Sequence, residues 1–161
     1  NDPDYIQIGW IGRARGMGEP KPCPIPPNTQ YAYMSLWSLM AAPLFYSGDM
    51  LRLDDFTLNV LCNAEVIEVN QDPIGSCASL LETGDQTFVL YKTLIDGSVA
   101  VGLFNQHTEP MEVSVSWDAV GHPGTHRVRD LWRQRDLGNY PNAFSALVPD
   151  RGVIMIRTSP E

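Results

Sequence analysis

The spacing of apolar residues along the chain changes near Gly75, and this change limits the folds that the chain can adopt. Before Gly75, short apolar runs alternate with stretches of helical periodicity, a pattern typical of parallel βα units. After it, the apolar runs are short and turn residues separate them, a pattern typical of antiparallel structure. We therefore predict a mostly β chain in two parts: residues 1–74 with mixed helix and strand, and residues 75–161 as an antiparallel β-sandwich.

Alternation and turn residues define the strands of the second part. Residues 87–94 and 98–105 flank Asp96-Gly97, a pair that favours a type I′ hairpin turn. Residues 111–117 alternate apolar and polar side chains, as expected of a strand with one wet face. About seven short strands at this spacing predict a sandwich. The further strands are expected at residues 77–82, 126–132, 142–148 and 153–158.

The first part of the chain is predicted to form two βα units. Residues 5–11 predict a buried strand, and residues 12–27, rich in Gly and Pro, predict a long loop. Asn28 is expected to cap a helix over residues 29–42. The remaining elements expected here are a short strand at residues 44–46, a helix capped by Asp54 and a helix at residues 64–69.

Two such units cannot close a parallel sheet, because each strand needs a neighbour on both sides. We expect their apolar side chains to face parallel strands that this chain does not supply, and each large side chain left exposed forgoes roughly 1.5–3 kcal/mol of burial. The side chains in question are Ile6, Ile8, Trp37, Leu39, Leu44 and Phe45.

The charge of the chain disfavours two classes of partner. Its net charge is −8 and its pI about 4.7, so it should repel nucleic acid phosphates and anionic membrane surfaces. No apolar run approaches the roughly 20 residues that span a bilayer. The three cysteines, Cys23, Cys62 and Cys77, match no zinc or redox spacing. These features leave the cellular compartment open.

Several segments of the chain resemble one known enzyme family. They are Asn-Asp-Pro-Asp at residues 1–4 and the segments 35–45, 66–75, 96–105 and 128–132. In this order they resemble glycoside hydrolase family 27, the α-galactosidase and α-N-acetylgalactosaminidase family. Residues 1–4 are similar to part of its Trp-Asn-Asp-Pro-Asp-Met-Leu motif, residues 35–45 resemble its seventh helix and eighth strand, and residues 66–75 resemble the segment that leaves the barrel. The last two segments resemble its C-terminal antiparallel domain.

The resemblance implies the last βα units of a (β/α)8 barrel followed by an antiparallel β-sandwich. A complete barrel needs roughly 250 residues. The family is a retaining one, so its chemistry uses two carboxylates about 5 Å apart. Both would precede Asn1, so we expect no catalytic residue in this chain and no activity from the chain alone. The implied partners are the missing N-terminal barrel portion and a galactose-containing oligosaccharide or glycoconjugate. No metal and no organic cofactor is implied.

The resemblance also implies a few substrate-binding residues. Asp4 matches an aspartate at the mouth of the seventh barrel strand, where a carboxylate can accept hydrogen bonds from sugar hydroxyls. Tyr5 stands where the family has Met and would line the sugar site. The long loop would lie beside that site, with Trp10 and Arg13 as its candidate residues.

Other readings of individual residues favour structural roles. Asp4 could instead be a turn residue of Asn-Asp-Pro-Asp. Asp54 and Asp55 are read as a helix cap and a first-turn residue rather than a catalytic pair. Trp117 is expected to pack in the core. The histidines, His107, His122 and His126, are expected at the surface.

A non-catalytic alternative stays open for the second part. Residues 75–161 are compatible with a β-sandwich module that binds carbohydrate or buttresses a barrel. The barrel-like residues 1–45 argue against this as the whole function, because a free binding module would not need them.

Overall fold

The computed structural model of the protein describes residues 2–12 and 18–161. None of the helices in this part of the chain is long and apolar enough to cross a membrane. The first elements are β1 (Trp10–Ile11), β2 (Lys21–Pro22), α1 (Pro27–Leu39), α2 (Asp55–Leu61) and α3 (Ala64–Asn70). The strands that follow are β3 (Ser79–Gly84), β4 (Thr87–Thr93), β5 (Val99–Asn105), β6 (Met111–Ser116), β7 (Thr125–Asp130), β8 (Arg135–Pro141), β9 (Ala143–Val148) and β10 (Val153–Pro160).

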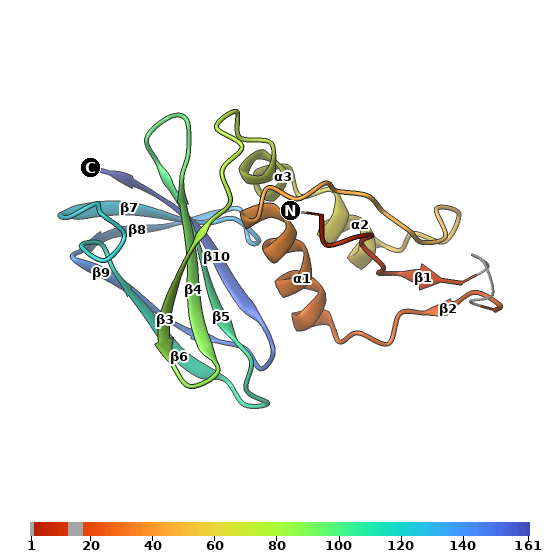
Figure 1. The fold of residues 1–161 in the computed structure, drawn as a ribbon. Helices are drawn as coiled ribbons and strands as arrows, with labels where there is room; N and C mark the ends of the chain where they lie inside the picture. Colours follow the sequence, from red (N-terminus) through yellow and green to blue (C-terminus); the bar gives the residue numbers. More distant parts are fainter. Residues whose placement is uncertain (1, 13–17) are drawn as a thin grey trace.

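Strands β3 to β10 form the predicted antiparallel sandwich (Figure 1). One layer is a six-stranded sheet in the order β3-β4-β5-β10-β7-β8, and the other is the pair β6-β9. Side chains of β6 alternate between the core and solvent as expected, and Trp117 is fully buried just after this strand. The indole Nε1 of Trp117 donates a hydrogen bond to the Tyr140 carbonyl (2.8 Å), which satisfies its polar atom in the core.

Helix α1 covers the other face of the six-stranded sheet, so β5 is buried on both faces (Figure 1). Ala100 and Phe104 belong to the core beneath the helices, whereas Val101 and Leu103 belong to the core between the sandwich layers. Gly102 lies under α1, where an added Cβ atom would come within 2.7 Å of Leu39 Cδ1. The absence of a side chain at Gly102 therefore allows the helix to pack closely on the sheet.

Ion pairs also join α3 to the sandwich. Arg129 of β7 binds Glu65 through two hydrogen bonds, from Nε at 2.7 Å and from Nη2 at 2.6 Å. Arg157 of β10 binds Glu68, one helical turn further along α3, at 3.0 Å. Two arginines on neighbouring strands thus hold two carboxylates that share one face of the helix.

Among the described residues of the first part, a single parallel bridge is present where two strands were predicted. Ile6 N donates to Phe45 O (2.7 Å), and Ser47 N donates to Ile6 O (2.9 Å), so residues Ile6 and Tyr46 pair in parallel. The strand expected over residues 5–11 is wrong beyond this bridge, because residues 10–11 pair instead with β2. The parallel pairing among the described residues of this part is therefore confined to one bridge.

The apolar side chains of this part are less exposed than predicted. Ile6, Ile8 and Leu39 are at most 1 % exposed, because helices α1, α2 and α3 gather around them. Trp37 and Leu44 are half-buried. Phe45 keeps the predicted exposure, at 56 %.

Helix α1 begins differently from the prediction. Its N-cap is Pro26 and Pro27 occupies the first helical position, where the missing N–H costs nothing. The side chain of Asn28 therefore does not cap the helix, and it donates instead to Asp150 Oδ1 (3.1 Å). Asp54 caps α2 as predicted. Asn63 caps α3, and no cap was predicted for that helix.

Three details of the sandwich also differ from the predictions. The turn at Asp96-Gly97 is not type I′, because of its two central residues only Gly97 has positive φ (+83°). Gly97 N donates to Leu94 O (2.9 Å), which is the pattern of a type I turn followed by a left-handed residue. Strand β8 was not predicted. His126 is buried rather than at the surface, between Trp117 and the Thr158 hydroxyl.

Candidate functional site

Asp4 and Tyr5 lie immediately before the parallel bridge, and both are exposed. Asp4 adopts a left-handed backbone conformation, with φ of +74°, which is uncommon for a residue other than glycine. Its own N–H donates to Asp2 Oδ1 (3.0 Å), and its Oδ1 accepts from Tyr5 N (2.9 Å). The turn reading and the site reading of Asp4 are thus compatible, since the turn presents the carboxylate to solvent.

Helix α1 contacts this peptide from the inside. Tyr33 Oη donates to the Tyr5 carbonyl at 2.7 Å, and Trp37 Nε1 donates to the Asp4 carbonyl at 3.1 Å. The two rings lie one helical turn apart and meet edge to face, with centroids 4.1 Å apart. Neither residue was predicted to take part in the site. The i, i+4 spacing of two aromatic residues with polar tips was the available signal.

Tyr5 and Phe45 form an exposed aromatic surface beside Asp4. Their ring centroids lie 6.3 Å apart and their planes are tilted by 57°. They come from the two segments that meet at the parallel bridge, which explains why residues 40 positions apart share a surface. An exposed carboxylate flanked by aromatic rings can bind a ligand that has hydroxyl groups on one side and an apolar face on another.

The two predicted loop residues have different outcomes. Trp10 lies in β1, where the Arg52 guanidinium covers its ring with 4.8 Å between the Arg52 Cζ and the ring centroid. The Trp10 carbonyl accepts from Asp49 N (2.7 Å), so this residue fastens the 46–54 segment to β1. Arg13 lies outside the described residues.

The adjacent acids Asp54 and Asp55 form the N-terminus of α2. Asp54 Oδ1 accepts from Thr57 N at 2.7 Å. Hydrogen bonds from the Thr57 side chain and backbone lower the pKa of Asp54, which suits a permanently ionised cap and disfavours a general acid. Asp55 occupies the first turn of α2.

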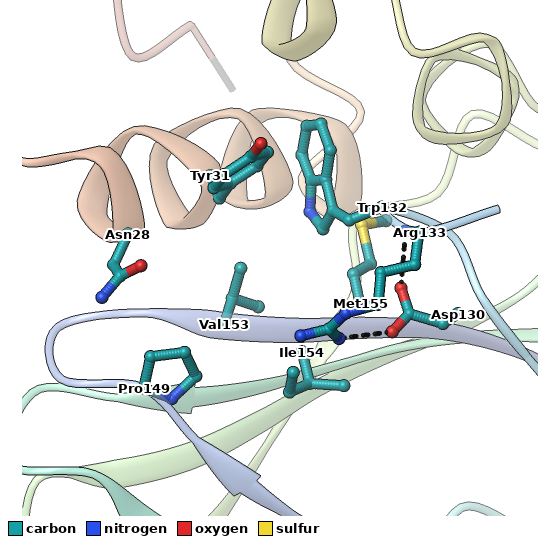
Figure 2. Close-up of a pocket in the computed structure, with 9 residues that line it drawn as sticks. All are labelled: Asn28, Tyr31, Asp130, Trp132, Arg133, Pro149, Val153, Ile154 and Met155. Carbon is teal, nitrogen blue, oxygen red and sulfur yellow. Dashed lines mark hydrogen bonds and ion pairs between the residues drawn. The ribbon is translucent and has the colours of Figure 1, made fainter. Parts of the chain in front are cut away.

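A separate cleft of about 190 Å³ lies between α1 and β10 (Figure 2). Tyr31 and Trp132 border it above, and Pro149 and Val153 border it below. Asp130 at its edge accepts hydrogen bonds from Arg133 N (2.9 Å) and Arg133 Nη1 (2.7 Å). Tyr31 is two positions from Tyr33, so the cleft and the Asp4 peptide lie against opposite sides of α1.

Comparisons with known proteins cover nearly the whole chain. A family model described as "Alpha galactosidase A" matches residues 1–72, and one described as "Alpha galactosidase C-terminal beta sandwich domain" matches residues 84–158. The chain belongs to glycoside hydrolase family 27. The two matches follow each other in the order of the barrel end and the sandwich, which agrees with the fold described above.

Relatives within family 27 are longer than this chain. A probable α-galactosidase of Dictyostelium discoideum is 34 % identical over 99 % of the chain, which spans 40 % of that protein. α-Galactosidase 3 of Arabidopsis thaliana is 31 % identical over the full chain, which spans 36 % of it. The crystal structure of a β-L-arabinopyranosidase of family 27 from Geobacillus stearothermophilus superposes with a TM-score of 0.91, at 27 % identity, over 99 % of the chain and 37 % of that enzyme.

Proposed function

We propose that this chain is the C-terminal part of a retaining exo-glycosidase that removes terminal α-linked galactose from oligosaccharides or glycoconjugates. The observation that carries the proposal is the relation to α-galactosidases along essentially the whole chain, at 34 % identity for the Dictyostelium relative. In this proposal residues 1–74 belong to the catalytic barrel and residues 75–161 form the sandwich that packs on it.

The chemistry would use a pair of carboxylates supplied by the rest of the barrel. One carboxylate attacks the anomeric carbon and the other protonates the leaving oxygen, and water then releases the sugar with the second group acting as base. This double displacement needs no metal and no organic cofactor. The chain alone would be inactive, because neither carboxylate of the pair is assigned to any of its residues.

The role of this chain would be to bind the sugar. The Asp4 carboxylate would accept hydrogen bonds from sugar hydroxyls, and charged acceptors make stronger hydrogen bonds than neutral ones. Tyr5 and Phe45 would contact the apolar face of the ring. The parallel bridge at Ile6 and Tyr46 would continue into the barrel strands on either side, which makes the remaining barrel the necessary partner of this chain.

Replacement of Asp4 by Asn in the longer polypeptide that carries the complete barrel tests this role. We expect kcat/KM on an aryl α-galactoside to fall by roughly 10- to 100-fold, since a hydrogen bond to a charged group contributes about 1.5–3 kcal/mol. Asp55→Asn, in the exposed first turn of α2, is the matched control and should change kcat/KM by less than about twofold. Equal effects of the two substitutions would contradict the role of Asp4.

The same polypeptide should be assayed with three aryl glycosides. Aryl α-galactoside, aryl α-N-acetylgalactosaminide and aryl β-L-arabinopyranoside separate the activities known among these relatives. We expect the α-galactoside to have the highest kcat/KM. Binding of galactose with no hydrolysis of any of the three would favour the alternative of a non-catalytic carbohydrate-binding module.

A further inference from the structure

We propose that Tyr33 and Trp37 are positioning residues that hold Asp4 in its left-handed conformation and thereby aim its carboxylate at the sugar. This inference rests on the function proposed above, in which Asp4 binds the sugar. Neither side chain is placed here in contact with the substrate. Both would act through the backbone of the Asp4-Tyr5 peptide.

The left-handed backbone conformation of Asp4 needs support from contacts around it. A residue with a Cβ atom loses energy in the left-handed region, so such a conformation persists only where surrounding contacts impose it. Asp4 has φ of +74° and an exposed side chain, so packing of its own side chain cannot supply that constraint. Within the turn, Asp4 N donates to Asp2 Oδ1 and the Asp4 carboxylate accepts from Tyr5 N. The contacts that join this turn to the rest of the fold are the hydrogen bonds to the carbonyls of Asp4 and Tyr5.

Helix α1 supplies the donors of the hydrogen bonds to these two carbonyls. The carbonyl oxygens of Asp4 and Tyr5 are consecutive along the chain, and each receives a donor from α1, Trp37 Nε1 at 3.1 Å and Tyr33 Oη at 2.7 Å. The hydrogen bond to the Asp4 carbonyl orients the peptide plane between Asp4 and Tyr5 and so restricts ψ of Asp4. The bond to the Tyr5 carbonyl orients the next peptide plane, so Tyr5 cannot rotate to release the first one. The edge-to-face contact of the two rings, 4.1 Å between centroids, holds the donors at a set separation.

Helix α1, which carries Tyr33 and Trp37, is a well-packed element. Tyr33 and Trp37 project from a 13-residue helix that packs on the sandwich through Leu39 and Met34, both nearly fully buried. Burial also raises the pKa of Tyr33, so its hydroxyl stays a donor at neutral and mildly alkaline pH. A ligand group carried by an exposed turn thus takes its orientation from a well-packed helix, and an ångström of misplacement can cost a large factor in rate.

The experiment is a double-mutant cycle in the longer polypeptide with the complete barrel. Tyr33→Phe removes one hydroxyl and keeps the ring, and we expect it to lower kcat/KM on an aryl α-galactoside about fivefold, the worth of one hydrogen bond, mainly through KM. In the Asp4→Asn background the same change should lower kcat/KM by less than about twofold, because the group it positions is gone. Trp37→Phe should behave in the same way.

Tyr31→Phe is the matched control. Tyr31 lies on the opposite side of α1, and its hydroxyl accepts a hydrogen bond from Asn59 (2.9 Å), so the substitution also removes one hydroxyl from this helix. We expect less than about a twofold change in kcat/KM. An effect of Tyr33→Phe that is equally large with and without the Asp4 carboxylate would show a merely structural role and would overturn the proposal.

A second measurement does not depend on activity. Backbone chemical shifts of Asp4 in this 161-residue chain should report the left-handed conformation in the wild type and in Tyr31→Phe, and a shift toward an extended conformation in the Tyr33→Phe, Trp37→Phe double variant. Unchanged Asp4 shifts in the double variant would refute the proposal. The wild-type polypeptide could lack glycosidase activity while the Asp4 shifts change as expected. That result would refute the proposed function and would still support the positioning of Asp4 by Tyr33 and Trp37.

Discussion

Asp54 and Asp55 show how two identical neighbours take different roles. Asp54 accepts a hydrogen bond from Thr57 N at 2.7 Å, and Asp55 lies within the first turn of α2. Asp54→Ala should lower the free energy of unfolding by about 1 kcal/mol, the usual contribution of an N-cap, and Asp55→Ala by clearly less. Urea denaturation at pH 7 measures both. Equal losses would contradict the assignment of Asp54 as the cap.

The lowered pKa of Asp54 adds a pH dependence to this prediction. Hydrogen bonds from Thr57 favour the ionised carboxylate in the folded state, so the stabilisation is present above the unfolded pKa. It is lost as the pH falls through the folded pKa, which lies below the ordinary aspartate value of 3.8. The difference between wild type and Asp54→Ala should therefore shrink between pH 5 and roughly pH 2.

Lys92 is a buried cation at the seam between α1 and the sandwich. Its side chain is 4 % exposed, and its Nζ donates to the carbonyls of Ser38 (3.3 Å), in the last turn of α1, and Ser76 (3.5 Å). Desolvation lowers the pKa of Lys92, and the charge of Asp72 opposes this effect. The contacts to a helix C-terminus are favourable for a cation, but burial of the charge is costly.

The sign of the resulting pH dependence is specific. Between the lowered folded pKa and 10.5, the unfolded value, the unfolded chain binds more protons than the folded one, so the free energy of unfolding rises with pH. We expect the wild type to gain stability relative to Lys92→Met as the pH increases from 7 to 10. Lys21→Met, at an exposed lysine of β2, is the control. A difference between wild type and Lys92→Met that is independent of pH would contradict this account.

At the residue scale the sequence predicted the Asp54 cap, whereas the Asn28 cap and the surface position of His126 were wrong. The Asp54 cap follows from a local pattern, and local hydrogen bonds do not depend on the rest of the fold. The burial of His126 depends on β7 pairing with β10, which places His126, Val128 and Asp130 on one inward face. Asp4 was predicted from the family motif, whereas its conformation depends on α1 and was not predicted.

At the scale of elements, the contact between α1 and β5 depends on Gly102. A Cβ atom there would lie 2.7 Å from Leu39 Cδ1 and 2.6 Å from Phe104 Cε2. Both side chains are buried and have little room to move. Gly102→Ala should therefore destabilise the chain by roughly 1–3 kcal/mol, as expected of an overpacked core, measured by urea denaturation.

The double variant Gly102→Ala, Leu39→Ala tests the cause of this loss. Leu39→Ala alone removes a fully buried side chain and should cost about 2–5 kcal/mol. If the clash with Leu39 is responsible, the double variant should lose less than the sum of the two single losses. Additive losses would indicate that Gly102 matters for another reason.

The elements that the sequence failed to predict share a dependence on distant partners. Strand β8 has the sequence Arg-Asp-Leu-Gly-Asn-Tyr-Pro, without apolar alternation, and exists because it pairs with β7 at both of its ends, with one register shift between Val128 and Arg129. The strands expected at residues 5–11 and 44–46 reduce to one bridge, because parallel strands need neighbours on both sides. In contrast, β6 was predictable, since one of its faces packs on a core and the other meets water.

At the scale of the whole molecule, the described residues form an antiparallel sandwich and a helical part with one parallel bridge, which are joined through α1 and α3 (Figure 1). The sandwich could be predicted from alternation and turns alone. The family of residues 1–72 could be predicted only from the family motifs, because the described residues of this part contain one parallel bridge and no larger parallel sheet. Ile6 and Ile8 are buried because the helices pack around them.

The most direct test of the account compares the 161-residue chain with the longer polypeptide in hydrolysis of an aryl α-galactoside, each at the same molar concentration. We predict that the longer polypeptide releases the aryl group and that the 161-residue chain alone does not, because the reacting carboxylates would come from the rest of the barrel. Hydrolysis by the 161-residue chain alone, or its absence in the longer polypeptide, would contradict the account.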